Sequence, residues 1–126
     1  MQTTPLLQRI GQIAVNVKDV ARATAFYRDA LGVRHLFDAG PKMSFFMLGD
    51  VRLMLGVAEK PEFDHPGSIL YLVVADIDAA YSSLKGKGVA FEDAPHLIAK
   101  MPDHELWMAF FRDSEGNLLA LMCEKR

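Results

Sequence analysis

The sequence predicts an α+β domain made of two tandem βαβββ modules, whose strands form a curved mixed sheet with a cup-shaped face. Residues 12–20 are similar to residues 69–77, with valine aligned to valine and aspartate to aspartate. A second pair of similar segments, residues 50–55 and 116–121, closes each half. A repeat of this size indicates two copies of one supersecondary unit, each of which needs the other to cover its sheet.

The first module, residues 8–58, begins with a strand, because apolar and polar side chains alternate from Gln12 to Val17. Asp19 is an N-cap for the following helix, which Gly32 ends in a C-cap position. Three strands are expected after the helix, at residues 33–37, 44–48 and 51–55.

The second module, residues 68–125, repeats this order. A strand is expected at residues 69–74, followed by a helix that Asp76 caps and that ends at Gly86-Lys87-Gly88. A short strand at 89–91 and a loop through Pro95 and Pro102 lead to the last hairpin. Its two strands are placed at residues 106–112 and 117–123. The polar, Pro- and Gly-rich residues 59–67 are expected to link the modules.

Composition excludes several classes of partner. The chain has 126 residues, enough for one domain with a real core, and a net charge of -2. This charge gives no electrostatic reason to expect nucleic acid or an anionic membrane as partner. No apolar run approaches membrane-spanning length, residues 1–5 lack a secretory signal, and the single Cys123 has no partner for an internal disulfide. We therefore expect a cytoplasmic protein.

Four segments carry a resemblance to a known family. They are Val17-Lys18-Asp19-Val20, Phe26-Tyr27-Arg28-Asp29 with Leu31-Gly32, Val74-Ala75-Asp76-Ile77-Asp78, and Phe111-Arg112-Asp113-Ser114-Glu115-Gly116-Asn117. In this order and spacing the chain resembles the vicinal oxygen chelate superfamily, which includes glyoxalase I, methylmalonyl-CoA epimerase, extradiol dioxygenases and bleomycin-resistance proteins. The resemblance implies the glyoxalase/bleomycin-resistance/dioxygenase fold over residues 1–126. It implies no particular reaction, because one fold hosts many activities.

The resemblance also implies where a catalytic metal would be held. Enzymes of this superfamily usually bind one divalent metal with four side chains, one from each of four strands. The corresponding positions here are Gln12, Met54, Ile69 and Ala120. A catalytic metal needs about three protein ligands, whereas these positions offer one amide, one thioether and two side chains without donor atoms. We therefore expect no metal and no other cofactor.

Strand alternation divides the side chains into a helix-facing set and a set that lines the cup. The cup set is mostly apolar and aromatic, with a few polar groups, which is the composition of a small-molecule pocket. A shift of one residue in register would exchange the two sets. The predicted pocket residues are Gln12, Asn16, Phe45, Met47, Arg52, Met54, Ile69, Tyr71, Trp107, Phe111, Ala120 and Met122.

Several of these residues have a second interpretation. For Met54, Met122 and Phe111 the favoured alternative is that each simply fills the barrel interior. An inward-pointing Arg52 would need an anionic partner such as a bound carboxylate or phosphate. The alternative for Arg52 is an ion pair with Asp50 at the end of the strand.

These features favour a protein that binds a small apolar or aromatic molecule without a metal, as bleomycin-resistance proteins do. If Arg52 faces the pocket, the bound molecule could also be anionic. The alternative is a glyoxalase-, epimerase- or dioxygenase-like enzyme with a relocated metal or metal-independent acid–base chemistry. His104 and Tyr71 are the candidate catalytic residues for that alternative, with Glu105 as a further base. A relocated metal would draw on His65, His96, His104 and Cys123. A structural or regulatory domain without a ligand is a third interpretation.

We further expect a homodimer, because a helix-backed sheet leaves apolar surface exposed. The cup would then form either within one chain or between the first module of one chain and the second module of another. Leu6, Leu7 and Phe63 are apolar residues outside the repeat and are expected at the interface.

Overall fold

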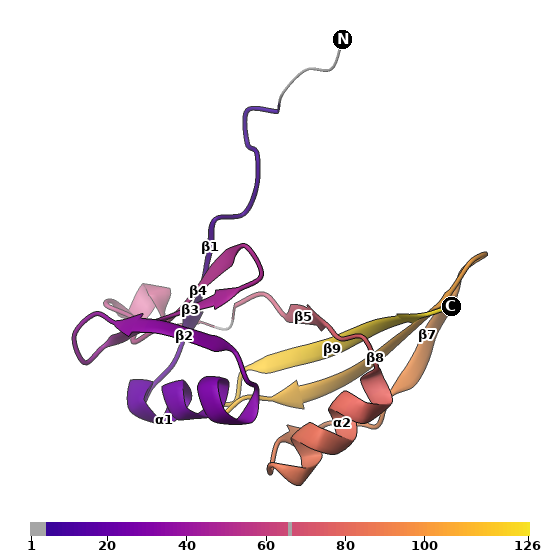
Figure 1. The fold of residues 1–126 in the computed structure, drawn as a ribbon. Coiled ribbons are helices and arrows are strands. Elements are labelled where there is room, and N and C mark those ends of the chain that lie inside the picture. The colour runs from indigo at the N-terminus through magenta and orange to yellow at the C-terminus, as the bar shows by residue number, and fades with distance from the viewer. Residues whose placement is uncertain (1–4, 66) are drawn as a thin grey trace.

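The predicted mixed α+β architecture is confirmed by a computed structural model, which describes residues 5–65 and 67–126 (Figure 1). Residues 1–4 of the predicted N-terminus and Pro66 of the predicted linker lie outside the described residues. The first module contains β1 (Gln12–Asn16), α1 (Val20–Ala25), the π-helical η1 (Phe26–Ala30), β2 (Arg34–Asp38), β3 (Met43–Leu48) and β4 (Val51–Gly56). The short η2 (Pro61–Phe63) lies in the linker. The second module contains β5 (Leu70–Val73), α2 (Ile77–Gly86), β6 (Ala90–Phe91), β7 (His96–Lys100), β8 (Glu105–Arg112) and β9 (Leu118–Lys125).

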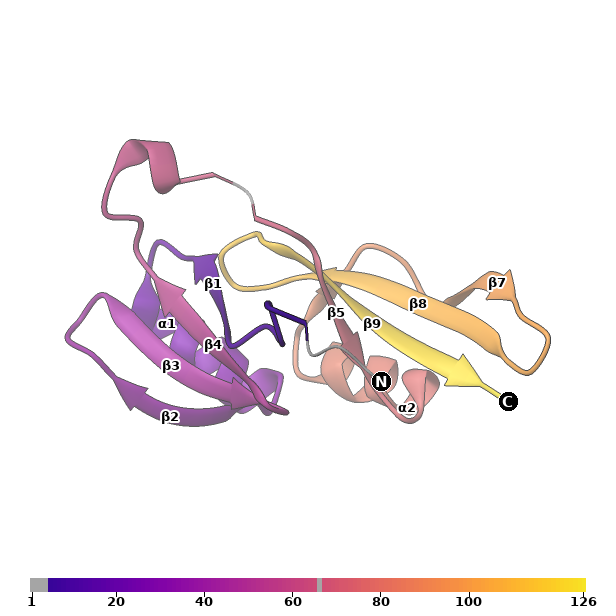
Figure 2. The ribbon, with the colours of Figure 1, turned by 90° about the horizontal axis from the view of Figure 1, so that it is seen from above.

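Each module forms its own mixed sheet. The first has the strand order β1-β4-β3-β2, and the second has the order β5-β9-β8-β6 with β7 also paired to β8. The pairs β1–β4 and β5–β9 are parallel, and the other pairs are antiparallel. The two sheets lie side by side, with α1 and α2 on the same side of them (Figures 1 and 2). Both sheets therefore present an opposite face, here called the open face, that no helix covers.

The ends of the helices follow the predicted capping residues. The Asp19 carboxylate accepts a hydrogen bond from the backbone N–H of Arg22 at 3.0 Å, and the Asp76 carboxylate accepts one from Ala79 N–H at 3.1 Å. Gly32 has a φ of 72°, a left-handed conformation that glycine adopts without strain. The first helix differs from expectation in its second half, where a π-helical turn widens the spiral and Leu31 N–H bonds to the Phe26 carbonyl.

One strand was not expected from the sequence. The sequence predicts a loop between Pro95 and Pro102, but residues 96–100 within it form β7 and pair with β8. The pairing contains an irregularity between Leu97 and Ala99, so the side chains do not alternate regularly along it. The missing alternation explains why the sequence pattern did not reveal this strand.

The hydrophobic core lies between the sheets and the helices. One cluster in the first module centres on Tyr27, Phe46 and Leu55, and one in the second centres on Ile77 and Phe111. Phe26, Leu31 and Leu70 pack against both clusters, so the two cores are continuous. Among the described residues, no helix is long and apolar enough to cross a membrane.

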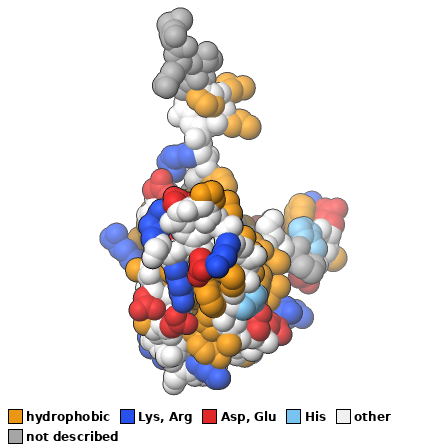
Figure 3. All heavy atoms as spheres, turned by 90° about the vertical axis from the view of Figure 1, so that its right-hand side faces the viewer, with side chains coloured by type: hydrophobic (Ala, Val, Ile, Leu, Met, Phe, Trp, Pro, Cys, Tyr) orange, Lys and Arg blue, Asp and Glu red, His pale blue; other side chains and the backbone are white. Residues whose placement is uncertain are grey.

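Residues 5–11, here called the arm, project from the body of the protein (Figure 1). Leu6 and Leu7 are 94% and 88% exposed, which is unusual for leucine. The space-filling view shows hydrophobic side chains gathered on this projection (Figure 3). The arm joins the sheet at Gly11, whose carbonyl accepts the backbone N–H of Arg52 at 3.1 Å.

Candidate functional site

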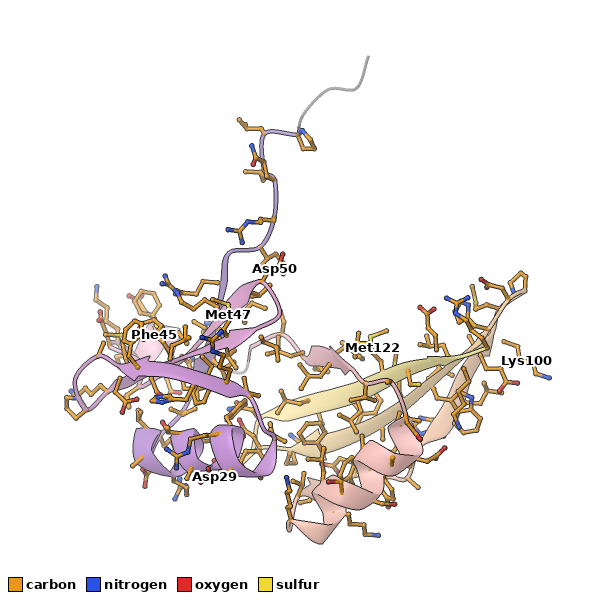
Figure 4. The ribbon with its side chains drawn as sticks, in the orientation of Figure 1. Asp29, Phe45, Met47, Asp50, Lys100 and Met122 are labelled. Carbon is orange, nitrogen blue, oxygen red and sulfur yellow. The ribbon has the colours of Figure 1, made fainter. Side chains whose placement is uncertain are left out.

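The open face of the first sheet carries most of the polar pocket residues predicted for this module. Leu53 and Leu55 of β4 are buried in the core, so Arg52 and Met54 between and beside them point the opposite way. Directly opposed residues on neighbouring strands share a face, which adds partners from β1 and β3. Phe45 and Met47 lie on the side of the sheet away from α1 (Figure 4). The predicted residues on this face are Gln12, Asn16, Phe45, Met47, Arg52 and Met54.

Arg52 is held in place by two neighbours on this face. Its Nε donates a 2.7 Å hydrogen bond to the Gln12 side-chain oxygen. Its guanidinium carbon lies 5.4 Å from the centre of the Phe45 ring, within the range of a cation–π contact. The predicted alternative, an ion pair with Asp50, is wrong for the described part of the chain, where the Arg52 guanidinium makes no ion pair and bonds instead to Gln12.

A shallow hollow of about 460 Å³ surrounds this arginine. It is lined by Arg9, Gly11, Gln12, Met47, Asp50 and Arg52, so the arm forms one of its walls. Arg9 bonds to the backbone oxygen of Asp50 at 3.3 Å. The hollow therefore carries two guanidinium groups and one carboxylate.

The open face of the second sheet is more apolar. Tyr71 and Val73 of β5 are 45% and 78% exposed. Tyr71 lies edge-on to Phe110 of β8, with ring centres 6.0 Å apart. The ring of His96, on the neighbouring strand β7, is stacked on Phe110 with ring centres 6.5 Å apart. Met122 lies on the side of the sheet away from α2 (Figure 4). The predicted residues on this side are Ile69, which precedes β5, and Tyr71, Ala120 and Met122.

Trp107 and Phe111 were expected on this open face, and that expectation is wrong. Phe111 is fully buried in the core under α2, and Trp107 packs against the same cluster. The reason is the register of the last hairpin, which pairs Phe111 with the core residue Leu119 and Trp107 with the core residue Cys123. The side chains that face Ala120 and Met122 are instead Phe110 and Met108.

The side chain of Asp113, in the turn of that hairpin, sets the register. The Asp113 carboxylate accepts the backbone N–H groups of Glu115 and Asn117, both at 2.8 Å. Such an aspartate turn fixes the loop length, and the loop length decides which residues oppose each other. Reading Asp113 as the start of a five-residue turn would have placed Phe110 on the open face.

The two candidate catalytic residues lie in different places. Tyr71 is on the open face, next to Phe110. His104 lies in the turn between β7 and β8, where its Nδ1 is 2.7 Å from an oxygen of Asp103. Together with Arg126, this histidine lowers the pKa of the Asp103 carboxyl below its usual value. His104 and Tyr71 therefore lie on different elements and do not form an acid–base pair.

A larger hollow of about 810 Å³ lies at the junction of the two modules, beneath the linker. Asn16 and Ile69 line this hollow. The side chain of Asn16 is already used in hydrogen bonds: its amide nitrogen donates to the linker carbonyls of Phe63 at 2.5 Å and His65 at 3.3 Å. Asn117 donates to the Asn16 carbonyl at 3.0 Å and to Asp113 at 2.9 Å. These hydrogen bonds tie the modules and the linker together.

Glu115 joins the two modules through several hydrogen bonds. Its carboxylate accepts the backbone N–H groups of Lys18 and Asp19 at 3.0 and 2.9 Å, and Arg22 Nε donates to it at 2.7 Å. The side chain is 1% exposed. The hydrogen bond from Arg22 and those from the two backbone N–H groups lower the pKa of Glu115 to about 2. The modules are thus joined by buried, charge-assisted contacts.

A sequence model of the Glyoxalase/Bleomycin resistance protein/Dioxygenase superfamily matches residues 9–121. The chain belongs to this superfamily. It is 28% identical to the Bacillus subtilis (strain 168) protein YraH, over 90% of this chain and 96% of YraH.

Solved structures of the superfamily have the same fold. A member from Sphaerobacter thermophilus DSM 20745 superposes with a TM-score of 0.78 at 26% identity, covering 95% of this chain and 100% of that one. TnmS3, an antibiotic binding protein from Streptomyces sp. CB03234, superposes with a TM-score of 0.75 at 26% identity, covering 96% and 99%.

The four positions that correspond to the metal ligands of superfamily enzymes, Gln12, Met54, Ile69 and Ala120, do not present a suitable set of ligands. The Gln12 oxygen accepts the Arg52 hydrogen bond, and its amide nitrogen lies 4.0 Å from the sulfur of Met54. Ile69 and Ala120 carry no donor atom. Within residues 5–65 and 67–126, no three His, Cys, Asp or Glu side chains are grouped so that they could hold a metal ion. These residues do not fit a divalent metal centre.

Proposed function

We propose that this superfamily member binds a small apolar or aromatic molecule on the open faces of its sheets. The observation that carries the proposal is that helices cover one face of each sheet, while the other face carries aromatic, methionine and valine side chains together with a few polar groups on the first sheet. Exposed apolar surface that is contiguous usually marks a binding site. Val73, the last residue of β5, is 78% exposed, and covering it would remove apolar surface from water.

Enclosing a ligand on these faces requires a second copy of the chain. Within one chain the two open faces lie side by side and point in the same direction (Figures 1 and 2). Glu115 and the Tyr27–Asp113 hydrogen bond hold the modules in this arrangement, so one face does not fold over the other. We infer that the first sheet of one copy faces the second sheet of its partner, which gives two equivalent ligand sites in a symmetric dimer.

The arm supports this assembly. Its leucines are almost fully exposed in the single chain, and it leaves the protein on the side of the open faces (Figure 1). Burying Leu6 and Leu7 against a partner would remove this apolar surface from water. Phe63 of the linker, 51% exposed, offers a further apolar contact.

The similarity to TnmS3 supports the binding of a small molecule, because that structure is of an antibiotic binding protein. The donor set at Gln12, Met54, Ile69 and Ala120 supports binding without a metal ion. Orientation of the ligand then depends on protein side chains and not on a metal ion.

A calorimetric and thermal-shift screen of aromatic acids and polycyclic antibiotics tests the proposal. We expect at least one compound to bind with a stoichiometry of one per chain, and Val73→Asp to abolish this binding. Ser82→Asp, which adds the same charge on the exposed side of α2, should leave it unchanged. A screen in which no compound binds would overturn the proposal.

Metal analysis of the purified protein tests the enzymatic alternative. We expect no stoichiometric nickel, zinc, iron or manganese, and no change in thermal stability when a chelator is added. Stoichiometric metal together with a loss of stability on chelation would favour a glyoxalase- or dioxygenase-like enzyme over a binding protein.

A further inference from the structure

We propose that Arg52 anchors the anionic group of the ligand, and that the ligand is an aromatic molecule bearing a carboxylate or a similar oxyanion. The inference rests on the proposed function, because it assigns a ligand class to the same open face. It adds a specificity-determining residue and a required charge to a site that is otherwise described by its apolar side chains.

The orientation of the Arg52 guanidinium is fixed before any ligand arrives. Gln12 accepts the hydrogen bond of Nε, and the Phe45 ring lies under the planar group at 5.4 Å. Holding a guanidinium in this way reduces the side-chain entropy that is lost when it binds a partner. Gln12 is in turn placed by the parallel pairing of β1 with β4, which aligns it with Arg52.

The hydrogen-bond donors of this arginine are only partly used. Among the described residues, the two terminal nitrogens of Arg52 donate to no acceptor, and no carboxylate lies within 4.0 Å of the group. A guanidinium presents these two nitrogens in a planar fork that matches the two oxygens of a carboxylate. The free edge of Arg52 is therefore suited to bidentate binding of an oxyanion.

The surrounding charge favours an anion over a cation. Arg9 of the arm lines the same hollow, and the one acidic side chain there is Asp50. Two guanidinium groups against one carboxylate leave a net positive charge in this hollow, which favours an anion over a cation.

The aromatic part of the ligand follows from what lies next to the arginine. Phe45 stacks on Phe37 with ring centres 4.8 Å apart, and Phe37 is 50% exposed. Met54 opposes Phe45 on the neighbouring strand. An arene attached to an oxyanion at Arg52 would therefore lie over two aromatic rings and a thioether, all of which contact flat apolar groups favourably.

Two fluorescent probes separate the charge from the arene. We would measure binding of 8-anilinonaphthalene-1-sulfonate and of N-phenyl-1-naphthylamine, which has the same arene without the sulfonate. Arg52→Gln should weaken binding of the anionic probe about tenfold and change the affinity for the neutral probe less than about twofold. Arg52→Lys keeps the charge but loses the planar fork of donors. Its affinity for the anionic probe should fall between those of the natural protein and Arg52→Gln. Arg28→Gln, the same charge change on the helix side, is the control and should match the natural protein.

Each outcome decides between the two proposals. Equal effects of Arg52→Gln and Arg28→Gln on the anionic probe would overturn the role of Arg52, while binding of the neutral probe would leave the proposed function intact. Failure of both probes to bind the natural protein would overturn both. Competition then identifies the oxyanion: 2-naphthoate should displace the anionic probe at least about tenfold better than 2-naphthamide. Equal displacement by these two competitors would exclude a carboxylate.

Discussion

The phenol of Tyr27 donates a 2.7 Å hydrogen bond to Oδ2 of Asp113 in the interior of the protein, and so joins the first helical segment to the turn between β8 and β9. Tyr27 is 1% exposed, and Asp113 is also buried. Burial and the neighbouring Asp113 carboxylate raise the pKa of the Tyr27 phenol far above its usual value. The Tyr27 phenol therefore keeps its proton, and its role as hydrogen-bond donor, at pH values at which an exposed tyrosine would ionise.

Removing this hydroxyl should weaken the junction between the modules. Tyr27→Phe deletes one charge-assisted hydrogen bond to a buried carboxylate, and we expect a loss of roughly 1.5–3 kcal/mol in the free energy of unfolding. Urea denaturation measures the effect. Tyr81→Phe is the matched control, because the Tyr81 hydroxyl contacts Lys85 on the exposed side of α2 and its loss should cost less than about 0.5 kcal/mol. Equal effects of the two changes would contradict the structural role of Tyr27.

Glu115 should make the stability of the protein depend on acidic pH. Its pKa is lowered from 4.5 to about 2 in the folded protein, so the unfolded chain binds its proton more readily. The resulting stabilisation is complete above pH 4.5 and is lost as pH falls toward 2. Its upper limit is about 3 kcal/mol. Because Arg22 is half-exposed, solvent screening reduces this to about 1–2 kcal/mol.

The variant Glu115→Gln isolates this contribution from that of the exposed acidic residues. It should be less stable than the natural protein at pH 7, and the difference should shrink as pH is lowered from 4.5 to 2. Urea denaturation at pH 7, 4 and 2.5 measures the difference. Two stability curves that run parallel over this range would show that Glu115 is not the group responsible.

The proposed dimer should depend on the open face of the second sheet. Light scattering at micromolar concentration is expected to give twice the 14.0 kDa mass of the chain. Val73→Asp places a charge on the open face of the second sheet, which is proposed to face the partner, and should shift the protein to a monomer. Leu7→Asp, in the arm, should weaken the dimer as well, whereas Ser82→Asp should not. A natural protein that remains monomeric throughout this concentration range would refute the assembly.

The elements that the sequence pattern predicted correctly are those that depend on neighbouring residues. Asp19 and Asp76 cap helices through N–H groups three positions away, and Gly32 ends a helix by its own conformation. The open face of the first sheet also followed from alternation, because Arg52 and Met54 flank a buried leucine. These are local relationships, and a single sequence contains them.

Contacts between distant segments were not predictable in the same way. Tyr27 and Asp113 both lie in recognisable motifs, but neither local sequence indicates that the two residues form a hydrogen bond with each other. β7 was missed because an irregularity disrupts its alternation. The face of Phe110 depends on a turn whose length is fixed by the Asp113 side chain, so an error of one residue there exchanged the two faces of β8.

The register of β8 leads to a prediction that separates Phe110 from Trp107. Phe110 lies on the open face against Tyr71, so Phe110→Ala should weaken binding of N-phenyl-1-naphthylamine by about fivefold or more. Trp107 lies on the helix side, where the Lys125 amine is 4.1 Å from the centre of its ring. Trp107→Phe should therefore change this affinity less than about twofold.

Unfolding measurements complete this test, because a loss of binding must not reflect a loss of folded protein. Phe111→Ala, one position along the same strand, should destabilise the protein by roughly 3–5 kcal/mol, since it removes a fully buried ring from the core. Phe110→Ala should cost much less, because Phe110 is only partly buried. If Trp107→Phe abolished binding while Phe110→Ala preserved it, the faces of β8 would be assigned the wrong way round, and the proposed ligand site on the second sheet would have to be abandoned.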